Sequence, residues 1–151
     1  MSRLKRILLA DDNPRDVELT LAALEEHRLA NEVVVVHDGA EALEYLYHQG
    51  KFAGSSHGFP AVIFLDLKMP KVDGLEVLRE IKSDPQRKSI PVVMLTSSRE
   101  EQDLVRSYNL GVNAYVVKPV DFTQFVESVK QLGLFWAVVN EPPVGIGFER
   151  A

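Results

Sequence analysis

Three acids, one hydroxyl and one lysine stand at the ends of short apolar runs in this chain. They are Asp11, Asp12, Asp66, Thr96 and Lys118. Short apolar runs that end on polar residues, with helical periodicity between them, are typical of buried strands in successive strand–helix units. The carboxyl ends of such parallel strands share one edge of the sheet, where open α/β folds place their sites. We therefore expect the five side chains to converge there and to bind a divalent cation and a phosphoryl group.

The adjacent acids Asp11 and Asp12 indicate a metal site. Acids at a helix N-terminus are favoured by the helix dipole, which offers a simpler reason for them. However, Asn13 is expected to cap the next helix, with Pro14 as its first residue, so two further carboxylates need another cause. Crowded acids repel one another, and one takes up a proton unless a cation lies among them. Together with Asp66 they form an oxygen-ligand set that suits Mg²⁺, which keeps several waters.

Asp66 is also a candidate nucleophile. A turn aspartate would explain it in isolation, but two more acids on the same edge favour a carboxylate that accepts a phosphoryl group. A metal and a lysine must then neutralise the phosphoryl oxygens. Lys118 is the candidate lysine, although most lysines are simply solvated. Thr96 could donate its hydroxyl to a phosphoryl oxygen, or merely end a strand as a β-branched residue.

The hydrophobic pattern predicts five strands that alternate with five helices. Strands are expected at about residues 5–10, 32–36, 61–66, 91–96 and 114–117. Helices are expected at about residues 14–27, 40–48 and 74–83, from Ser98 to near Tyr108, and from Asp121 to at least Leu132. A capping box, Ser98-x-x-Glu101, begins the fourth helix. Five such units predict an α/β fold with a doubly wound, five-stranded parallel sheet.

Composition limits the function classes. The chain has 151 residues, of which 46% are hydrophobic and 26% charged, as expected for one globular domain with a real core. A net charge of -5 argues against nucleic acid as a direct partner. The absence of cysteine excludes disulfides, thiolate metal sites and cysteine nucleophiles. No run is long enough to span a membrane, and Asp11 ends the first apolar run too early for a signal peptide, so we expect a cytoplasmic protein.

The motifs follow one another in a definite order. Asp11-Asp12 comes first, then Asp66-Leu67-Lys68-Met69-Pro70-Lys71-Val72-Asp73-Gly74, then Thr96-Ser97, Tyr115 and Lys118-Pro119. This order resembles the receiver domain of two-component response regulators, and the resemblance covers about residues 5–132. It implies a flavodoxin-like (βα)5 receiver fold. It also implies a phosphoacceptor signalling protein that catalyses only its own Mg²⁺-dependent phosphorylation and dephosphorylation.

The resemblance assigns roles to the acids and to the residue two positions after Asp66. Asp66 would accept a phosphoryl group from a sensor histidine kinase. Asp12 and Asp66 would bind Mg²⁺ through their side chains, and Asp11 would act through a water molecule. Lys68 would lend its backbone carbonyl to the same ion.

The resemblance also assigns roles to three residues on the last two strands. Lys118 would pair with the phosphoryl group, and the peptide bond before Pro119 is expected to be cis. Thr96 would move toward a phosphoryl oxygen, and Tyr115 would follow inward as the switch aromatic. A plain core or surface tyrosine is the alternative for Tyr115.

Two other classes of α/β protein fit the sequence less well. An aspartyl-nucleophile phosphatase needs a second acid two residues after its nucleophile, where this chain has Lys68. A flavodoxin-like cofactor binder needs a hydroxyl- and glycine-rich loop after the first strand, where Asp11 and Asp12 would repel a flavin phosphate. Both classes therefore rank behind the receiver domain.

We expect the receiver domain to occupy residues 1–140, and a tail that extends the last helix to occupy residues 141–151. No separate output domain is expected. The chain would then signal by phosphorylation-dependent contact with an unknown downstream protein. Two alternatives stay open: it could pass the phosphoryl group to a histidine phosphotransfer protein, or it could act as a phosphate sink.

The carboxyl-terminal stretch supports two further expectations. Residues 132–143, together with the long loop at residues 49–60, resemble the single-domain regulators that are paired with phytochrome-type photoreceptor kinases. The alternative is an ordinary last helix that folds back on its own domain. Within this stretch, residues 134–139 are apolar and continue a helix whose inner face is already apolar, and a helix that is apolar on all sides indicates a buried interface. We therefore expect a homodimer held by Leu134, Phe135, Trp136, Val138 and Val139.

Overall fold

The computed structural model describes residues 6–26, 32–55, 57–112 and 114–119, together with Thr123, Gln124 and Glu127. Most of the predicted last helix, the tail and the five predicted dimer residues lie outside the described residues. The domain boundary and the dimer therefore stay predictions.

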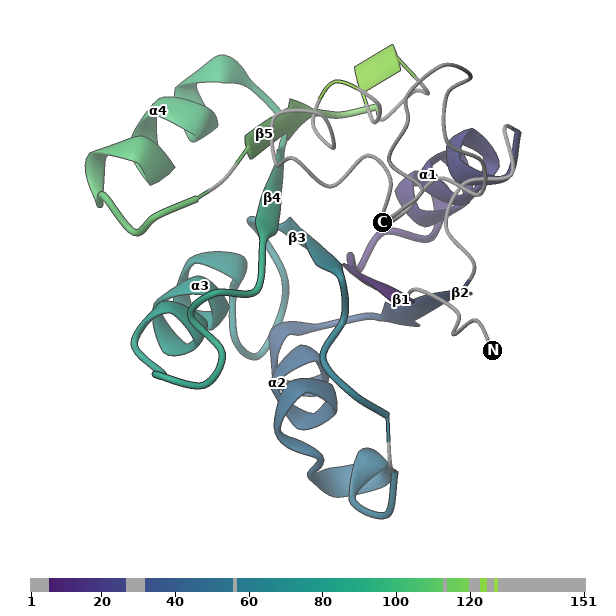
Figure 1. Ribbon diagram of the computed structural model, residues 1–151. Helices are drawn as coiled ribbons and strands as arrows, with labels where there is room; N and C mark the ends of the chain where they lie inside the picture. The colour runs from purple at the N-terminus through teal and green to yellow at the C-terminus, as the bar shows by residue number, and fades with distance from the viewer. Residues whose placement is uncertain are drawn as a thin grey trace, which may run out of the picture.

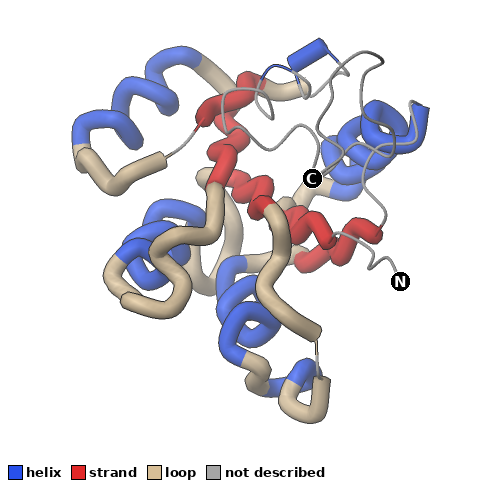
Figure 2. The backbone as a smooth tube through the Cα atoms, in the orientation of Figure 1, coloured by secondary structure: helices blue, strands red, loops and turns tan. Residues whose placement is uncertain are grey.

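Five parallel strands form one sheet in the order β2-β1-β3-β4-β5. The strands are β1 (Arg6–Ala10), β2 (Glu32–Val36), β3 (Val62–Asp66), β4 (Val92–Thr96) and β5 (Ala114–Val117). Figure 2 shows them as a row through the middle of the molecule. Every residue of β3 and β4 is buried, because both faces of these central strands are covered. The strand β3 lies between β1 and β4, so Asp66, its last residue, sits centrally on the carboxyl edge of the sheet.

Helices lie on both faces of the sheet, as the doubly wound prediction requires. They are α1 (Pro14–Glu26), α2 (Gly39–Tyr47), α3 (Gly74–Lys82) and α4 (Arg99–Ser107), with a short 3-10 helix η1 (Gly50–Phe52) after α2. Figure 1 shows α2, α3 and α4 on one side of the sheet and α1 on the other. The predicted fold class is confirmed, and among the elements of the described residues η1 alone was not anticipated, inside the loop predicted at residues 49–60.

The helix starts follow from local hydrogen bonds. The side-chain oxygen of Asn13 accepts the backbone N–H groups of Arg15 and Asp16, at 2.9 and 3.1 Å, which caps α1 as predicted. The hydroxyl of Ser98 accepts the N–H of Glu101 at 3.2 Å, so the predicted capping box begins α4. These caps place each helix directly after the loop that leaves the carboxyl edge of the sheet.

The main core fills the space between the sheet and the three helices on one face. Alternate strand residues point into it, such as Leu8 in β1, Ile63 and Leu65 in β3 and Met94 in β4, all fully buried. They meet Leu78 of α3 and equivalent residues of α2 and α4. Because this core fixes the register of the strands, it also fixes which polar residues meet at the carboxyl edge.

Candidate functional site

The strand ends bring the predicted residues to one edge of the sheet. Asp11 directly follows β1, Asp66 ends β3, Thr96 ends β4 and Lys118 directly follows β5. The Lys118-Pro119 peptide bond is cis, as expected. The apolar runs predicted this convergence, because neighbouring parallel strands end side by side.

The ammonium group of Lys118 lies among three carboxylates. Its Nζ is 3.0 Å from Oδ2 of Asp11, 3.2 Å from Oδ2 of Asp66 and 2.9 Å from Oδ2 of Asp16. Asp16 comes from the first turn of α1 and was not predicted as a site residue. An acid in a first helical turn carries no distinguishing signal, since the helix dipole favours acids there in any protein.

Three of the acids could hold a metal ion. Asp11, Asp12 and Asp66 each offer a carboxylate oxygen, and these oxygens all lie within 4.8 Å of one another. Asp11 and Asp66 are buried, whereas Asp12 is exposed. Oδ1 of Asp11 accepts the N–H of Asn13 at 3.1 Å, but its buried Oδ2 receives no hydrogen bond of good geometry even from the nearby Lys118. An all-oxygen set with a buried, incompletely bonded oxygen fits a hard divalent cation.

We define the acidic centre as Asp11, Asp12, Asp16, Asp66 and Lys118. It holds four acids and one cation, so the acids are not fully compensated. Burial, and then the charge of Asp11, outweigh the attraction of Lys118 and raise the pKa of Asp66 to about 7. Burial alone would lower the pKa of Lys118, but the surrounding carboxylates, led by Asp16, hold it above its ordinary value. The arrangement can therefore attract an added cation and, beside the lysine, an anionic group.

The helix α3 begins directly against the backbone of Asp66, and a glycine allows this. A Cβ atom at Gly74 would lie 2.1 Å from the carbonyl oxygen of Asp66. This separation is too short for any side chain, so only glycine fits at this position. The N–H of Gly74 donates to the carbonyl of Leu67 at 2.8 Å, which closes the loop after β3. Lys68 lies in this loop with an exposed side chain, and its Nζ is 3.4 Å from a carboxylate oxygen of Glu101. The role of the Lys68 carbonyl as a metal ligand stays a prediction.

The predicted switch residues Thr96 and Tyr115 occupy different environments. Thr96 is fully buried, and its hydroxyl has no hydrogen-bond partner. A buried hydroxyl without a partner lowers stability, and the switch role of Thr96 stays a prediction. Tyr115 is half-buried on β5, and the guanidinium of Arg106 from α4 lies 4.5 Å from the centre of its ring. Burial raises the pKa of the Tyr115 hydroxyl.

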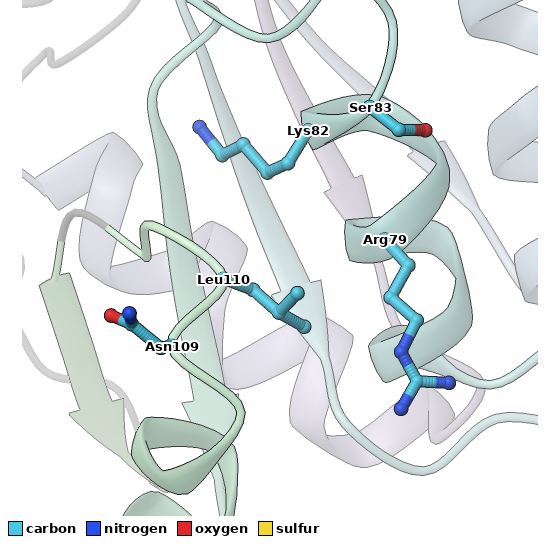
Figure 3. Close-up of a pocket in the computed structure, with 5 residues that line it drawn as sticks. All are labelled: Arg79, Lys82, Ser83, Asn109 and Leu110. Atoms are coloured by element: carbon cyan, nitrogen blue, oxygen red, sulfur yellow. The ribbon is translucent and has the colours of Figure 1, made fainter.

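A pocket of about 470 Å³ lies at the other end of α3 (Figure 3). It is lined by Arg79, Lys82, Ser83, Asn109 and Leu110. The ammonium of Lys82 donates to the backbone carbonyls of Lys88 and Ile90, at 3.0 and 3.3 Å, so this cation is used within the chain. The pocket brings together none of the predicted site residues.

A comparison with protein families identifies the family of the chain. The profile of the response regulator receiver domain matches residues 7–130. The chain belongs to this receiver family. Among the described residues, no helix is long and apolar enough to cross a membrane.

Three relatives of this receiver resemble it over most of its length. Response regulator Rcp1 of Synechocystis sp. is 39% identical over 87% of this chain and 88% of its own length. The structure of the bacteriophytochrome response regulator RtBRR shares 64% identity over 95% of this chain and 86% of that one, with a TM-score of 0.86. The phosphorylated cyanobacterial phytochrome response regulator RcpA shares 45% identity over 89% of this chain and 95% of that one, with a TM-score of 0.72.

A structure of Rcp1 supports the metal site. The Mn²⁺-bound form of Rcp1 is 38% identical to this receiver over 93% of this chain and 99% of that one, with a TM-score of 0.71. This receiver has its own cluster of three acids, whose carboxylate oxygens lie close enough together to hold a metal ion. The family, the relative and the cluster together support divalent-metal binding.

Proposed function

We propose that this receiver accepts a phosphoryl group on Asp66 from a histidine kinase in a reaction that requires Mg²⁺. The carrying observation is the position of Asp66, buried at the end of the central strand with the Lys118 ammonium 3.2 Å from its carboxylate. Two more acids beside it supply the oxygen ligands for the cation. A nucleophilic carboxylate, a lysine and a metal site are the parts that phosphoryl transfer to an aspartate needs.

The chemistry can be written for the residues present. A carboxylate oxygen of Asp66 attacks the phosphorus of a phosphohistidine, so an O–P bond forms and the P–N bond breaks. The electron pair of the broken bond goes to the imidazole nitrogen, and a proton carried by the other ring nitrogen of the phosphohistidine lets the ring leave as neutral imidazole. Lys118 attracts the phosphoryl oxygens as they arrive. When bound, Mg²⁺ would neutralise the charge shared by the carboxylates and the phosphoryl group.

The response to phosphorylation is proposed to pass through Thr96 and Tyr115. The hydroxyl of Thr96, which has no hydrogen-bond partner, would donate to a phosphoryl oxygen. The movement of the Thr96 side chain would open space for the Tyr115 ring. Arg106 of α4 now lies against that ring, 4.5 Å from its centre, so an inward Tyr115 must change a contact on the α4–β5 surface. A phosphoryl group can shift this equilibrium only through contacts that differ between the two states, and the contacts of Thr96 and Tyr115 would be those contacts.

We further propose that the donor is a phytochrome-type histidine kinase. The support is the similarity to RtBRR and RcpA, both described as regulators of phytochromes, at 64% and 45% identity. Signalling would then proceed by phosphorylation-dependent contact with a downstream protein.

Labelling at Asp66 tests the proposal. With Mg²⁺ and a small phosphodonor, intact-mass measurement should show one added phosphoryl group on the wild type. The Asp66→Asn variant and a chelator-treated wild type should gain none. Asp84→Asn is the matched control, since it removes another partly buried acid at the far end of α3. The same assay with phosphorylated kinases as donors should show the fastest transfer from a phytochrome-type kinase. Labelling of Asp66→Asn at the wild-type rate would contradict the assignment.

A further inference from the structure

The carboxylate of Glu101 connects the two loops beside the acidic centre. Its Oε1 accepts the backbone N–H of Ser97 at 2.8 Å and the Ser97 hydroxyl at 3.1 Å. Its Oε2 lies 3.4 Å from Nζ of Lys68. The Glu101 side chain is only 16% exposed. We call these contacts the Glu101 bridge.

The Glu101 bridge lies next to the proposed phosphoacceptor. Ser97 directly follows Thr96, and Lys68 follows Asp66 by two residues. Asp66 pairs in register with Leu95, and the N–H of Leu67 donates to the carbonyl of Leu95 at 3.2 Å. The loop after β3 and the loop after β4 therefore leave the sheet side by side. Glu101 joins these two loops at the carboxyl edge of the sheet, next to Asp66.

The start of α2 repeats the arrangement with partners that belong to neither of these two loops. Oε1 of Glu41 accepts the N–H of His37 at 2.8 Å, as Glu101 does with Ser97. Glu41 also pairs with a lysine, Lys51 of η1, and its side chain is 13% exposed. The hydrogen bonds are thus a general way to begin a helix. What distinguishes Glu101 is that its two partners belong to the loops of the proposed acceptor and of Thr96.

The donors held by Glu101 lie in the two loops beside Asp66, near the place of an anion on that residue. Burial would raise the pKa of Glu101, but the Ser97 hydrogen bonds and Lys68 outweigh it and hold the pKa below its ordinary value, so the carboxylate is charged. A phosphoryl group carries more negative charge than a carboxylate and has more acceptor oxygens. Lys118 is engaged by three carboxylates and Thr96 offers one hydroxyl, so further donors must come from nearby groups.

We propose that Glu101 is a competing internal anion, which occupies the Ser97 N–H and the Lys68 ammonium until a phosphoryl group on Asp66 displaces it. This inference rests on the proposed function of Asp66. Glu101 acts here as a positioning residue, because it touches the donors and not the reacting atoms. Its release also detaches the first turn of α4 from the loop after β3. The exchange therefore couples the acceptor to α4, where Leu104 is exposed, and to the exposed Tyr108 directly after it.

Beryllium fluoride, a phosphoryl mimic, tests the exchange when it is added with Mg²⁺. The Glu101→Gln variant keeps an acceptor for Ser97 but loses the charge that competes for the donors. It should bind the mimic roughly tenfold more tightly than the wild type, since a hydrogen bond to a charged group contributes more than one to a neutral group. The affinity can be measured from amide chemical shifts during a titration. A merely structural cap would leave the affinity unchanged or weaken it.

Two control variants separate the bridge from general effects. Glu41→Gln removes the same helix-start carboxylate from α2. Glu100→Gln removes an exposed charge from the same first turn of α4. Both should bind the mimic within about twofold of the wild type, because neither carboxylate is bound to Ser97. An equal gain in affinity in Glu100→Gln would overturn the proposal, as would no gain in Glu101→Gln.

A measurement on the wild type keeps the test decisive if Glu101→Gln does not fold. On addition of the mimic, the carboxyl carbon resonance of Glu101 should move toward that of the exposed Glu100. An unchanged Glu101 resonance in protein saturated with the mimic would refute the exchange alone. If the wild type binds the mimic no better than Asp66→Asn does, the proposed function fails instead.

Discussion

Two clusters of charged side chains lie at opposite ends of the sheet. They differ in how completely their charges and hydrogen-bonding groups find partners within the cluster. The acidic centre occupies the carboxyl edge. The second cluster, here called the Arg87 cluster, consists of Tyr47 at the end of α2 with Asp84 and Arg87 from the loop after α3. Both contain a carboxylate beside a cation, so the comparison isolates what surrounds such a pair.

The Arg87 cluster is balanced in charge, and both oxygens of its carboxylate accept hydrogen bonds. Oδ2 of Asp84 accepts the Tyr47 hydroxyl at 2.8 Å and a guanidinium N–H of Arg87 at 2.9 Å, while Oδ1 accepts the N–H of Gln86. Nε of Arg87 donates to the carbonyl of Leu46 at 3.0 Å, and the guanidinium lies 4.0 Å from the centre of the Tyr47 ring. The hydrogen bonds from Gln86 and Tyr47 hold the pKa of Asp84 below its ordinary value.

The acidic centre has the opposite character. Four acids surround one lysine, and the pKa of Asp66 is raised to about 7 by burial and by Asp11. Among the described residues, three buried side-chain atoms have no hydrogen-bond partner, and two of them, Asp11 Oδ2 and Thr96 Oγ1, belong to this edge. A cluster that only stabilises the fold can be completed from within. The acidic centre leaves acids uncompensated and polar atoms without a partner, an arrangement that is typical of binding sites.

The largest expected effect comes from removing the cation of each cluster. Lys118→Met leaves buried carboxylates facing one another and should lower the free energy of unfolding by about 3 kcal/mol in chelator. Arg87→Met keeps the apolar stem and should cost about 2 kcal/mol through lost hydrogen bonds. Saturating Mg²⁺ should restore much of the loss in Lys118→Met, because it can replace the missing positive charge, and none in Arg87→Met. Chemical unfolding with and without Mg²⁺ measures this, and equal recovery in both variants would contradict the comparison.

The sequence predicted the acidic centre better than the Arg87 cluster for a physical reason. Asp66, Thr96 and Lys118 end apolar runs, and parallel strands that end on one edge need no further information to bring these residues together. Arg87 and Tyr47 meet through the path of two loops, for which no local pattern exists.

The same limit applies to two residues of the carboxyl edge itself. Glu101 was predicted as part of a helix start, and that is confirmed, but its contact with Lys68 depends on the course of the loop after β3. Asp16 was missed because an acid in the first turn is compatible with any helix. Its contact with Lys118 depends on the position of the first turn of α1 beside the carboxyl edge of the sheet.

An intermediate effect, which depends on pH, is expected from neutralising the carboxylates. In the folded, metal-free chain the pKa of Asp66 is about 7, against an ordinary value of 3.8 in the unfolded chain. Between these values the unfolded chain loses the proton while the folded chain keeps it, so stability falls as pH rises through this window. Asp66→Asn should therefore raise the free energy of unfolding by about 1–2 kcal/mol at pH 8, with solvent screening reducing the full linkage, and by less at pH 5.

The matched variant in the Arg87 cluster should behave in the opposite way. The pKa of Asp84 is lowered, so its stabilising contribution is fully present above its unfolded value of 3.8 and is lost only as pH falls below it. Asp84→Asn should accordingly destabilise the chain to the same extent at pH 5 and pH 8. Thermal unfolding in chelator at the two pH values checks both variants. A pH-independent effect of Asp66→Asn would show that the carboxylate is already compensated in the metal-free protein.

The smallest expected effect comes from the hydroxyls of the two clusters. Thr96→Val removes a buried hydroxyl without a partner and keeps the shape of the side chain, so it should raise the free energy of unfolding by about 0.5–1 kcal/mol. Tyr47→Phe removes a hydroxyl that donates to Asp84 at 2.8 Å and should lower the free energy of unfolding by about 1 kcal/mol.

The effects of the same two variants on signalling should have the opposite order, with the loss in Thr96→Val. With beryllium fluoride and Mg²⁺, Tyr47→Phe should show the wild-type change in the amide spectrum of α4 and β5, whereas Thr96→Val should still bind the mimic at Asp66 and lose most of that change. A full response in Thr96→Val would mean that its hydroxyl is not the group that reports the state of Asp66.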